Sequence, residues 1–298
     1  MNRSHDTTND PMAPGSGEAG TRLRAGLIGG GSIARVIARA IAEPRPAPDG
    51  VAAVRHRVQL IGALVHDTAR ARAHGFTERV PLITTLDEFL AARPAQVAEC
   101  AGHGGLAEYG ARILGAGIDL VVASVGALAD SALEHSLREA ARGSGARIHI
   151  PSGAVGALDA LSAARFGGLT AVRYVGRKPI AAWRGTRAVE TVDLDRIEAA
   201  TTVFEGSARE AALAFPQNAN VCAAIALAGV GMDATQVRLV ADPLARGNEH
   251  EIEAEGSFGT LRFSVVGKPL AENPKTSSLA AYSLLRALVS PSETLAIG

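Results

Sequence analysis

Cysteine and long apolar runs are scarce in this sequence, and each scarcity excludes a class of protein. Two cysteines, Cys100 and Cys222, are too few for a disulfide framework and lack the spacing of a metal site. No run of about 18 apolar residues occurs, so we expect no membrane span. The first 21 residues are polar, lack a signal-peptide core, and are expected to form a disordered tail. We therefore predict a cytoplasmic protein with buried structural thiols and no membrane partner.

An excess of charge of either sign is also missing. The chain has 30 basic and 30 acidic residues, for a formal net charge of zero. Without a basic excess to neutralise phosphates, we expect no nucleic-acid partner. The histidines have no HExxH or CxxC partners, so we expect no metal site.

Strands and helices alternate over residues 22–149. Apolar residues recur at helical spacing over 33–41, directly after the first apolar segment. Five apolar segments have the character of buried strands: 23–28, 58–65, 97–100, 118–124 and 146–151. This order predicts an α/β dinucleotide-binding domain, with a Rossmann-type doubly wound parallel sheet and right-handed crossovers. A proline-rich loop at 44–50 interrupts the pattern.

The pattern changes near residue 150. Two helical stretches, 207–215 and 218–229, lie among six half-exposed segments that we interpret as strands: 170–179, 189–195, 200–206, 235–243, 250–256 and 259–267. We therefore predict a smaller α+β catalytic domain over 150–275, with a mixed or antiparallel sheet and helices on one face. A last helix, within 276–298, is expected to pack back on the first domain.

A glycine-rich turn joins the first predicted strand to the first helix. Its residues match the G-x-G-x-x-G/A pattern of dinucleotide-binding loops: Gly29-Gly30-Gly31-Ser32-Ile33-Ala34. Gly29 allows the tight turn, and Gly31 lets the backbone approach a pyrophosphate. The helix that begins at Ser32 and Ile33 offers free N–H groups to phosphates. In this context the loop predicts a bound NAD or NADP.

The second predicted strand ends near Asp67, the candidate partner for the ribose 2′-hydroxyl of NAD. Asp67 fits equally well as the N-cap of the following helix. His66, Arg70 and Arg72 flank it and are suited to a 2′-phosphate, so the choice between NAD and NADP stays open.

Five segments, in this order, resemble the L-aspartate dehydrogenases: Ser124-Val125-Gly126-Ala127-Leu128-Ala129-Asp130, Pro151-Ser152-Gly153-Ala154-Val155-Gly156-Ala157-Leu158-Asp159-Ala160, Phe215-Pro216-Gln217-Asn218-Ala219-Asn220-Val221, Asn248-Glu249-His250-Glu251-Ile252 and Asn273-Pro274-Lys275-Thr276-Ser277. The resemblance covers roughly residues 22–290 and departs slightly at Gly30 and Ala34. It implies oxidation of L-aspartate to iminoaspartate, which yields oxaloacetate and ammonia, or the reverse amination, and it implies a role in NAD biosynthesis. It also implies that His250 is the active-site residue and that Ala154 and Asn220 contact the cofactor.

The residues themselves fit this chemistry without requiring it. A histidine such as His250, oriented by a neighbouring carboxylate and titrating near neutrality, can take the ammonium proton. Asn248 fits a substrate contact or a turn equally well. The candidates for binding the substrate carboxylates are Arg177 and Lys178, and Lys275 with Thr276 and Ser277. Ser152 and Gly153 are the alternative, as hydroxyl and backbone donors.

Two other functions stay open: a sugar or imine oxidoreductase with the same two-domain plan, and a regulatory protein that binds NAD(P) without turnover. The sugar enzymes often carry a Glu-Lys-Pro motif, which is missing from the corresponding segment at 123–126. A homodimer is expected for either enzyme.

Overall fold

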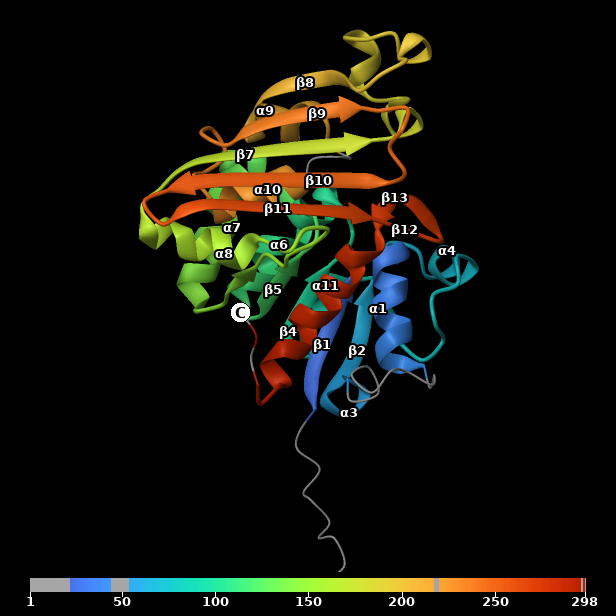
Figure 1. Ribbon diagram of the computed structural model, residues 1–298. Coiled ribbons are helices and arrows are strands. Elements are labelled where there is room, and N and C mark those ends of the chain that lie inside the picture. The colour runs from blue at the N-terminus through green and yellow to red at the C-terminus, as the bar shows by residue number, and fades with distance from the viewer. Residues whose placement is uncertain (1–21, 44–53, 217–219, 296, 298) are drawn as a thin grey trace, which may run out of the picture.

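The computed structural model describes residues 22–43, 54–216, 220–295 and 297. The expected tail and the proline loop at 44–50 lie outside these residues. Two sheets, with helices packed against each, make up the described part of the chain (Figure 1). The N-terminal half of the chain builds one sheet and the C-terminal half builds the other.

The first sheet has six parallel strands in the order β3-β2-β1-β4-β5-β6. The strands are β1 (Leu23–Ile28), β2 (Val58–Leu64), β3 (Leu82–Ile83), β4 (Gln96–Glu99), β5 (Asp119–Val122) and β6 (Ile148–His149). The predicted doubly wound parallel sheet is confirmed, and β3 is a short strand that the pattern did not predict. The strand order reverses between β1 and β4, so a crevice for a ligand opens at the carboxyl ends of these two strands.

Helices connect the strands of the first sheet: α1 (Ser32–Ala42), α3 (Val54–Arg57), α4 (Thr68–Ala73), α5 (Leu86–Ala91), α6 (His103–Gly115), the 3₁₀ segment η1 (Val125–Ala129) and α7 (Ser131–Ser144). The apolar stripe of α1 is buried, with Ala34 and Ile37 fully inaccessible against the sheet. This burial fixes the start of α1 beside the end of β1 and so positions the glycine-rich turn between them.

The second sheet has five strands in the order β11-β10-β7-β9-β8, and only β7 and β9 pair in parallel. The strands are β7 (Leu169–Lys178), β8 (Thr201–Ser207), β9 (Gln236–Ala241), β10 (Asn248–Gly256) and β11 (Gly259–Gly267). Three helices accompany them: α8 (Leu158–Ala164), α9 (Ala208–Ala214) and α10 (Asn220–Ala228). The predicted mixed sheet is therefore confirmed.

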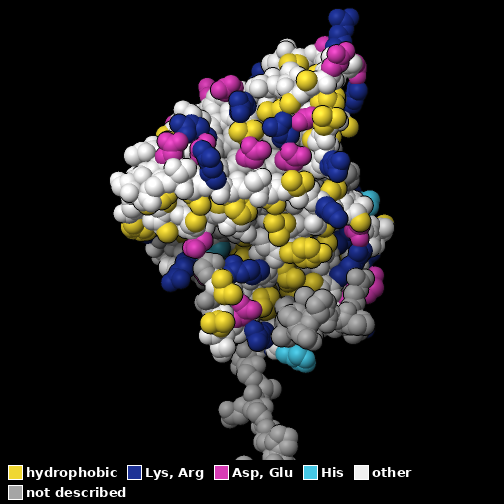
Figure 2. Space-filling model, in the orientation of Figure 1, with side chains coloured by type: hydrophobic (Ala, Val, Ile, Leu, Met, Phe, Trp, Pro, Cys, Tyr) yellow, Lys and Arg dark blue, Asp and Glu magenta, His cyan; other side chains and the backbone are white. Residues whose placement is uncertain are grey.

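Successive residues of β7 and β10 point to opposite faces of the second sheet. The outer face carries interspersed basic and acidic side chains, as Figure 2 shows, including the cross-strand pair Arg173–Glu255 at 2.8 Å. The inner face buries Tyr174, Lys178 and His250. Polar side chains on a buried sheet face need hydrogen-bond partners or a ligand, so the inner face is a candidate ligand-binding surface.

The strand predicted at 189–195 is wrong. This segment forms two short 3₁₀ turns, η4 (Arg187–Glu190) and η5 (Leu194–Arg196). The side chain of Thr186 accepts a hydrogen bond from the Ala188 N–H, and that of Asp193 accepts one from the Asp195 N–H. Such local side-chain bonds to the backbone compete with strand pairing, and here they close turns instead.

The C-terminal segment crosses back to the first sheet. A small hairpin, β12 (Pro269–Leu270) and β13 (Asn273–Ser277), leads into α11 (Ser278–Val289). The buried face of α11 shares a core cluster with residues of α1 and β1. The end of the chain therefore joins the second sheet to the start of α1 (Figure 1).

Candidate active site

The glycine-rich turn leaves the start of α1 open to an anion. Gly29 has φ +97°, and a Cβ there would lie 2.8 Å from the Cys100 carbonyl oxygen, so only glycine fits. Gly31 is the N-cap of α1 and supplies no side-chain cap, and no acidic residue lies in the first turn. The free N–H groups of this helix end suit a pyrophosphate. The geometry therefore fits the dinucleotide that the sequence predicts.

Ser32, at the start of the same helix, already has a partner from the other end of the chain. Its hydroxyl accepts a hydrogen bond from the Asn273 amide at 3.2 Å. Glu272, beside Asn273, pairs with Arg35 at 2.9 Å. The β12–β13 hairpin is thus tied to the start of α1, next to the predicted phosphate site.

Asp67 follows β2 and is the N-cap of α4, where its side chain accepts a hydrogen bond from the Arg70 N–H at 2.8 Å. Of the two interpretations of Asp67, the structure therefore gives direct evidence for the cap. Arg72 donates to main-chain carbonyls, including that of Val80 at 2.9 Å, so its guanidinium group already has partners within the protein. His66 lies beside Tyr109, with ring centroids 6.1 Å apart.

A cavity of about 160 Å³ lies between the two sheets and contains most of the predicted site residues. Lys275 belongs to β13, but its side chain lies outside what the structure describes. Gly29, Gly31 and Ser32 adjoin the cavity through their neighbour Ile33, whereas Asp67 lies at the end of β2. Seven predicted residues line the cavity: Ile33, Ala154, Lys178, Asn220, Asn248, His250 and Thr276.

His250 lies on the inner face of β10 and is 3% exposed. Its Nδ1 lies 2.8 Å from the Tyr174 hydroxyl, and the two rings stack. Gly176 makes this contact possible, because a Cβ at that position would lie 2.6 Å from the same hydroxyl. The expected carboxylate partner is therefore wrong, since Glu249 and Glu251 alternate to the outer face of the strand.

The expected near-neutral titration of His250 is also wrong. Burial lowers the pKa of His250 to about 4, and the positive charge of Lys178 lowers it further in the same direction. The imidazole is therefore neutral at physiological pH. No feature of the local sequence reveals this, because the burial arises from packing between sheets.

Lys178 and Arg177, adjacent on β7, have opposite environments. Arg177 pairs with Asp242 at 2.9 Å and with Glu249 at 3.5 Å, away from the cavity. Lys178 lies inside it, 8% exposed, with its Nζ 5.8 Å from the centroid of the Trp183 ring. Burial lowers the pKa of Lys178 to about 8. Of the two basic residues, only Lys178 is placed to meet a ligand in the cavity.

Asn220, the first residue of α10, links the two halves of the site. Its Oδ1 accepts a hydrogen bond from the Gly126 N–H at 2.9 Å and lies 3.4 Å from His103 Nε2. With that oxygen engaged, the amide N–H groups of Asn220 are the ones left to face a ligand. Ala154, predicted with Asn220, is buried in the turn that enters the second domain.

Glu99 is a residue that the sequence analysis missed. It ends β4, is fully buried, and accepts hydrogen bonds from the N–H groups of Ala101 (2.8 Å) and Gly102 (3.0 Å). It also accepts from the Ser124 N–H at 2.9 Å and from the Ser124 hydroxyl at 3.0 Å. Burial raises the pKa of Glu99, although these bonds act in the opposite direction. The carboxylate thus holds together the loops that follow β4 and β5 at the crevice.

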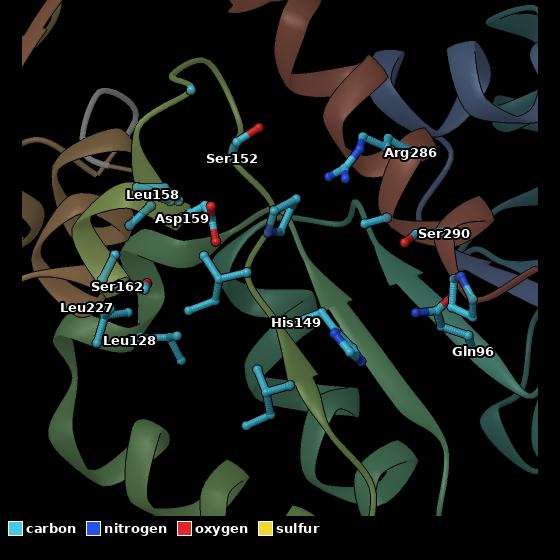
Figure 3. A pocket seen from close by; sticks show the side chains of 18 of the residues that line it. Gln96, Leu128, His149, Ser152, Leu158, Asp159, Ser162, Leu227, Arg286 and Ser290 are labelled. Carbon is cyan, nitrogen blue, oxygen red and sulfur yellow. The ribbon is translucent and has the colours of Figure 1, made fainter. Parts of the chain in front are cut away.

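A larger cavity, of about 710 Å³, shares Pro151, Ser152 and Ala224 with the first. Figure 3 shows Asp159 on one wall, Arg286 on the opposite wall and His149 between them. None of the predicted site residues that the structure describes lines this cavity. The smaller cavity, where the predicted residues converge, is therefore the candidate active site.

Two family matches divide the chain in the same way as the two sheets. Residues 29–151 match the family described as homoserine dehydrogenase, NAD binding domain, and residues 159–290 match aspartate dehydrogenase, C-terminal. The chain is 48% identical to the L-aspartate dehydrogenase of Ruegeria pomeroyi, over 92% of this chain and 94% of that protein. This chain belongs to the L-aspartate dehydrogenase family. The resemblance seen in the five sequence segments is confirmed.

Other members and a solved structure support the same assignment. The L-aspartate dehydrogenase of Cupriavidus taiwanensis is 43% identical over 89% of this chain and 96% of its own length. The crystal structure of aspartate dehydrogenase from Thermotoga maritima superposes with a TM-score of 0.67 at 25% identity, covering 93% of this chain and all of that one. The first domain is accordingly an NAD(P)-binding domain. Among the described residues, no helix is long and apolar enough to cross a membrane, and no three His, Cys, Asp or Glu side chains cluster as metal ligands.

Proposed function

We propose that this chain catalyses the NAD(P)-dependent oxidation of L-aspartate to iminoaspartate, which hydrolyses to oxaloacetate and ammonia, and the reverse reaction. The observation that carries this proposal is the charge of the cavity. Among the described residues that line it, Lys178 is the one Lys or Arg, and none is Asp or Glu. A buried lining that carries a lysine and no acidic side chain favours an anionic substrate such as a dicarboxylate.

The cofactor would occupy the crevice beside this cavity. The phosphates would bind at the open start of α1, and Asp67, which follows β2, would lie near the adenosine ribose. When bound, NAD or NADP supplies the hydride acceptor for the substrate Cα–H bond. The residues proposed to hold it are Gly29, Gly31, Ser32, Ile33, Asp67, Ala154 and Asn220.

His250 is the proposed catalytic residue, and its part is proton transfer. The substrate amine must be neutral before the C=N bond can form, because its lone pair makes that bond. The Tyr174 hydroxyl can accept a hydrogen bond from Nδ1–H, which leaves Nε2 unprotonated and able to take the ammonium proton. Substrate carboxylates near Lys178 would offset the positive field that now weakens His250 as a base.

The remaining polar residues are proposed to bind the substrate. Asn248 lines the cavity on the same strand face as His250, two residues away. Thr276 accepts a hydrogen bond from the Asn273 amide at 3.0 Å, so its own hydroxyl proton is left to donate. Lys178 would bind a carboxylate, and Lys275 is proposed only from its place in the sequence motif. We also propose a homodimer in the cytoplasm, where the thiols of Cys100 and Cys222 would stay reduced.

The test is the absorbance of reduced nicotinamide with purified protein, L-aspartate and either NAD or NADP. Malate, glutamate, alanine and D-aspartate are the controls. Reduction with L-aspartate alone supports the proposal and identifies the preferred cofactor. Tight cofactor binding without reduction by any amino acid would overturn it in favour of a sugar-type or regulatory protein.

A further inference from the structure

The start of α11 faces the active-site cavity with unused hydrogen-bond donors. This helix has 12 residues, and Ala280 and Leu284 on one side of it line the cavity. The N-cap, Ser277, makes no side-chain cap, and the first turn has no acidic residue. The Ser278 N–H donates to the Lys268 carbonyl at 3.0 Å. Within the described chain, nothing accepts from the next two N–H groups of this turn.

Ser277 provides a second, independent sign of a ligand at this place. It lines the cavity and is 6% exposed, yet its hydroxyl has no hydrogen-bond partner among the described residues. Buried hydroxyls in folded proteins are nearly always paired, because an unpaired one has lost its bonds to water. An unpaired hydroxyl beside an uncapped helix start is a ready site for a carboxylate, which accepts several hydrogen bonds.

We infer that the start of α11, with the Ser277 hydroxyl, binds the side-chain carboxylate of the substrate, while Lys178 binds the carboxylate on Cα. This inference rests on the proposed oxidation of L-aspartate. It makes α11 a specificity-determining element, because it selects amino acids with a second carboxylate over those without one. The sequence names Ser277 only as one of several candidates for either carboxylate, and it does not point to the start of α11.

The positions of the two anchors decide which carboxylate goes where. His250 of β10 pairs with Gly176 of β7, and Lys178 is two residues farther along β7 on the same buried face, so the two lie close together. His250 must reach the amine on Cα, and the carboxylate on the same carbon therefore lies near Lys178. Ser277 lies on the other side of β10 from β7 and Lys178: Asn248 pairs with Gly267 of β11, and a Cβ built at Gly267 would be 3.3 Å from the Ser277 hydroxyl. The second carboxylate, two bonds beyond Cα, extends in that direction.

The experiment compares two inhibitors on wild type and on Ser277→Ala. Succinate has two carboxylates, and succinamate has a single carboxylate, which we expect to occupy the Lys178 anchor. Inhibition against L-aspartate is measured at saturating NAD(P), with ligand-induced shifts in melting temperature as a readout that does not depend on turnover. We expect Ser277→Ala to weaken succinate about 10- to 100-fold, the loss of one hydrogen bond to a charged group, and to leave succinamate and the KM for NAD(P) unchanged.

Ser278→Ala is the matched control. This neighbouring hydroxyl donates to the Lys268 carbonyl at 3.1 Å and does not line the cavity, so its removal should leave both inhibition constants unchanged. Ser277→Ala should fold with an unchanged or higher melting temperature, because it removes an unpaired buried hydroxyl.

Equal weakening of both inhibitors, or no change in succinate binding, would overturn the assignment of Ser277. Succinate binding that depends on Ser277 in a protein that does not oxidise L-aspartate would support the carboxylate site and refute the proposed function. The two failures are therefore distinguishable.

Discussion

Replacing Lys178 by methionine tests whether a buried cation defines the active site. Methionine has nearly the length of lysine and is apolar, so the variant removes the charge and keeps most of the packing. Lys178 has a pKa lowered from 10.5 to about 8, mainly by burial. That difference corresponds to about 3 kcal/mol of unfavourable energy for the charged form in the folded protein.

The sign of the pH dependence follows from this difference. Between pH 8 and 10.5 the unfolded chain binds more protons at Lys178 than the folded protein does, so this lysine makes the wild type more stable as pH rises through that window. Lys178→Met lacks this titration. Its free energy of unfolding relative to wild type should therefore fall by about 3 kcal/mol from neutral pH to above pH 10.5.

Two assays check the reasoning. Urea unfolding of both proteins across this pH range gives the difference in the free energy of unfolding. Initial rates at neutral pH give the KM for L-aspartate, which should rise about 10- to 100-fold on loss of a bond to a charged group. Lys268→Met removes an exposed lysine outside the cavity and should leave this KM unchanged. A pH-independent stability difference together with an unchanged KM would show that Lys178 is not a buried cation that meets the substrate.

Three further changes address the cofactor site and the proton-transfer residue. His250→Ala should lower kcat at least about 100-fold, the usual range for a lost general base, while the Kd for NAD(P) measured by fluorescence stays the same; near-normal turnover would refute the role of His250. Gly29→Ala should abolish NAD(P) binding in the same fluorescence titration, because its Cβ would lie 2.8 Å from the Cys100 carbonyl oxygen, and retained binding would contradict the proposed loop. Asp67→Ala should cost about 1 kcal/mol of stability in urea unfolding through loss of the cap on the Arg70 N–H. The same variant should raise the KM for NAD more than that for NADP, and an equal effect on both would leave Asp67 as a cap alone.

The sequence predicts those parts of the fold that depend on residues close together in the chain. The glycine-rich turn, the helix after it and the alternation over 22–149 need only neighbouring residues to be recognised. The strand predicted at 189–195 is wrong because a local pattern can also mislead. The segment has the alternating pattern of a strand, but the side chains of Thr186 and Asp193 accept hydrogen bonds from nearby backbone N–H groups, and these bonds stabilise turns instead.

The site needs information that the sequence does not carry in any one segment. The contact between His250 and Tyr174 depends on the register of β7 against β10, 76 residues apart, and on the space left by Gly176. Strand alternation indicates that Arg177 and Lys178 face opposite sides, but only the packed sheet shows which of them is buried. In the sequence, Glu99 is simply an acidic residue at the end of a predicted strand. Only the folded structure shows that its carboxylate accepts hydrogen bonds from four donors.

Burial of the site disfavours positive charge on Lys178 and His250 in the free protein, and a bound carboxylate would favour it. It lowers the pKa values of Lys178 and His250 together, so the empty cavity tends to lose positive charge. A carboxylate that binds Lys178 would favour the charged lysine, and its own negative charge would offset the field of that lysine at the imidazole. Substrate binding and the basicity of His250 would therefore be coupled through the carboxylate on Cα that Lys178 is proposed to hold. The second carboxylate, at the start of α11, would select the substrate without taking part in this coupling.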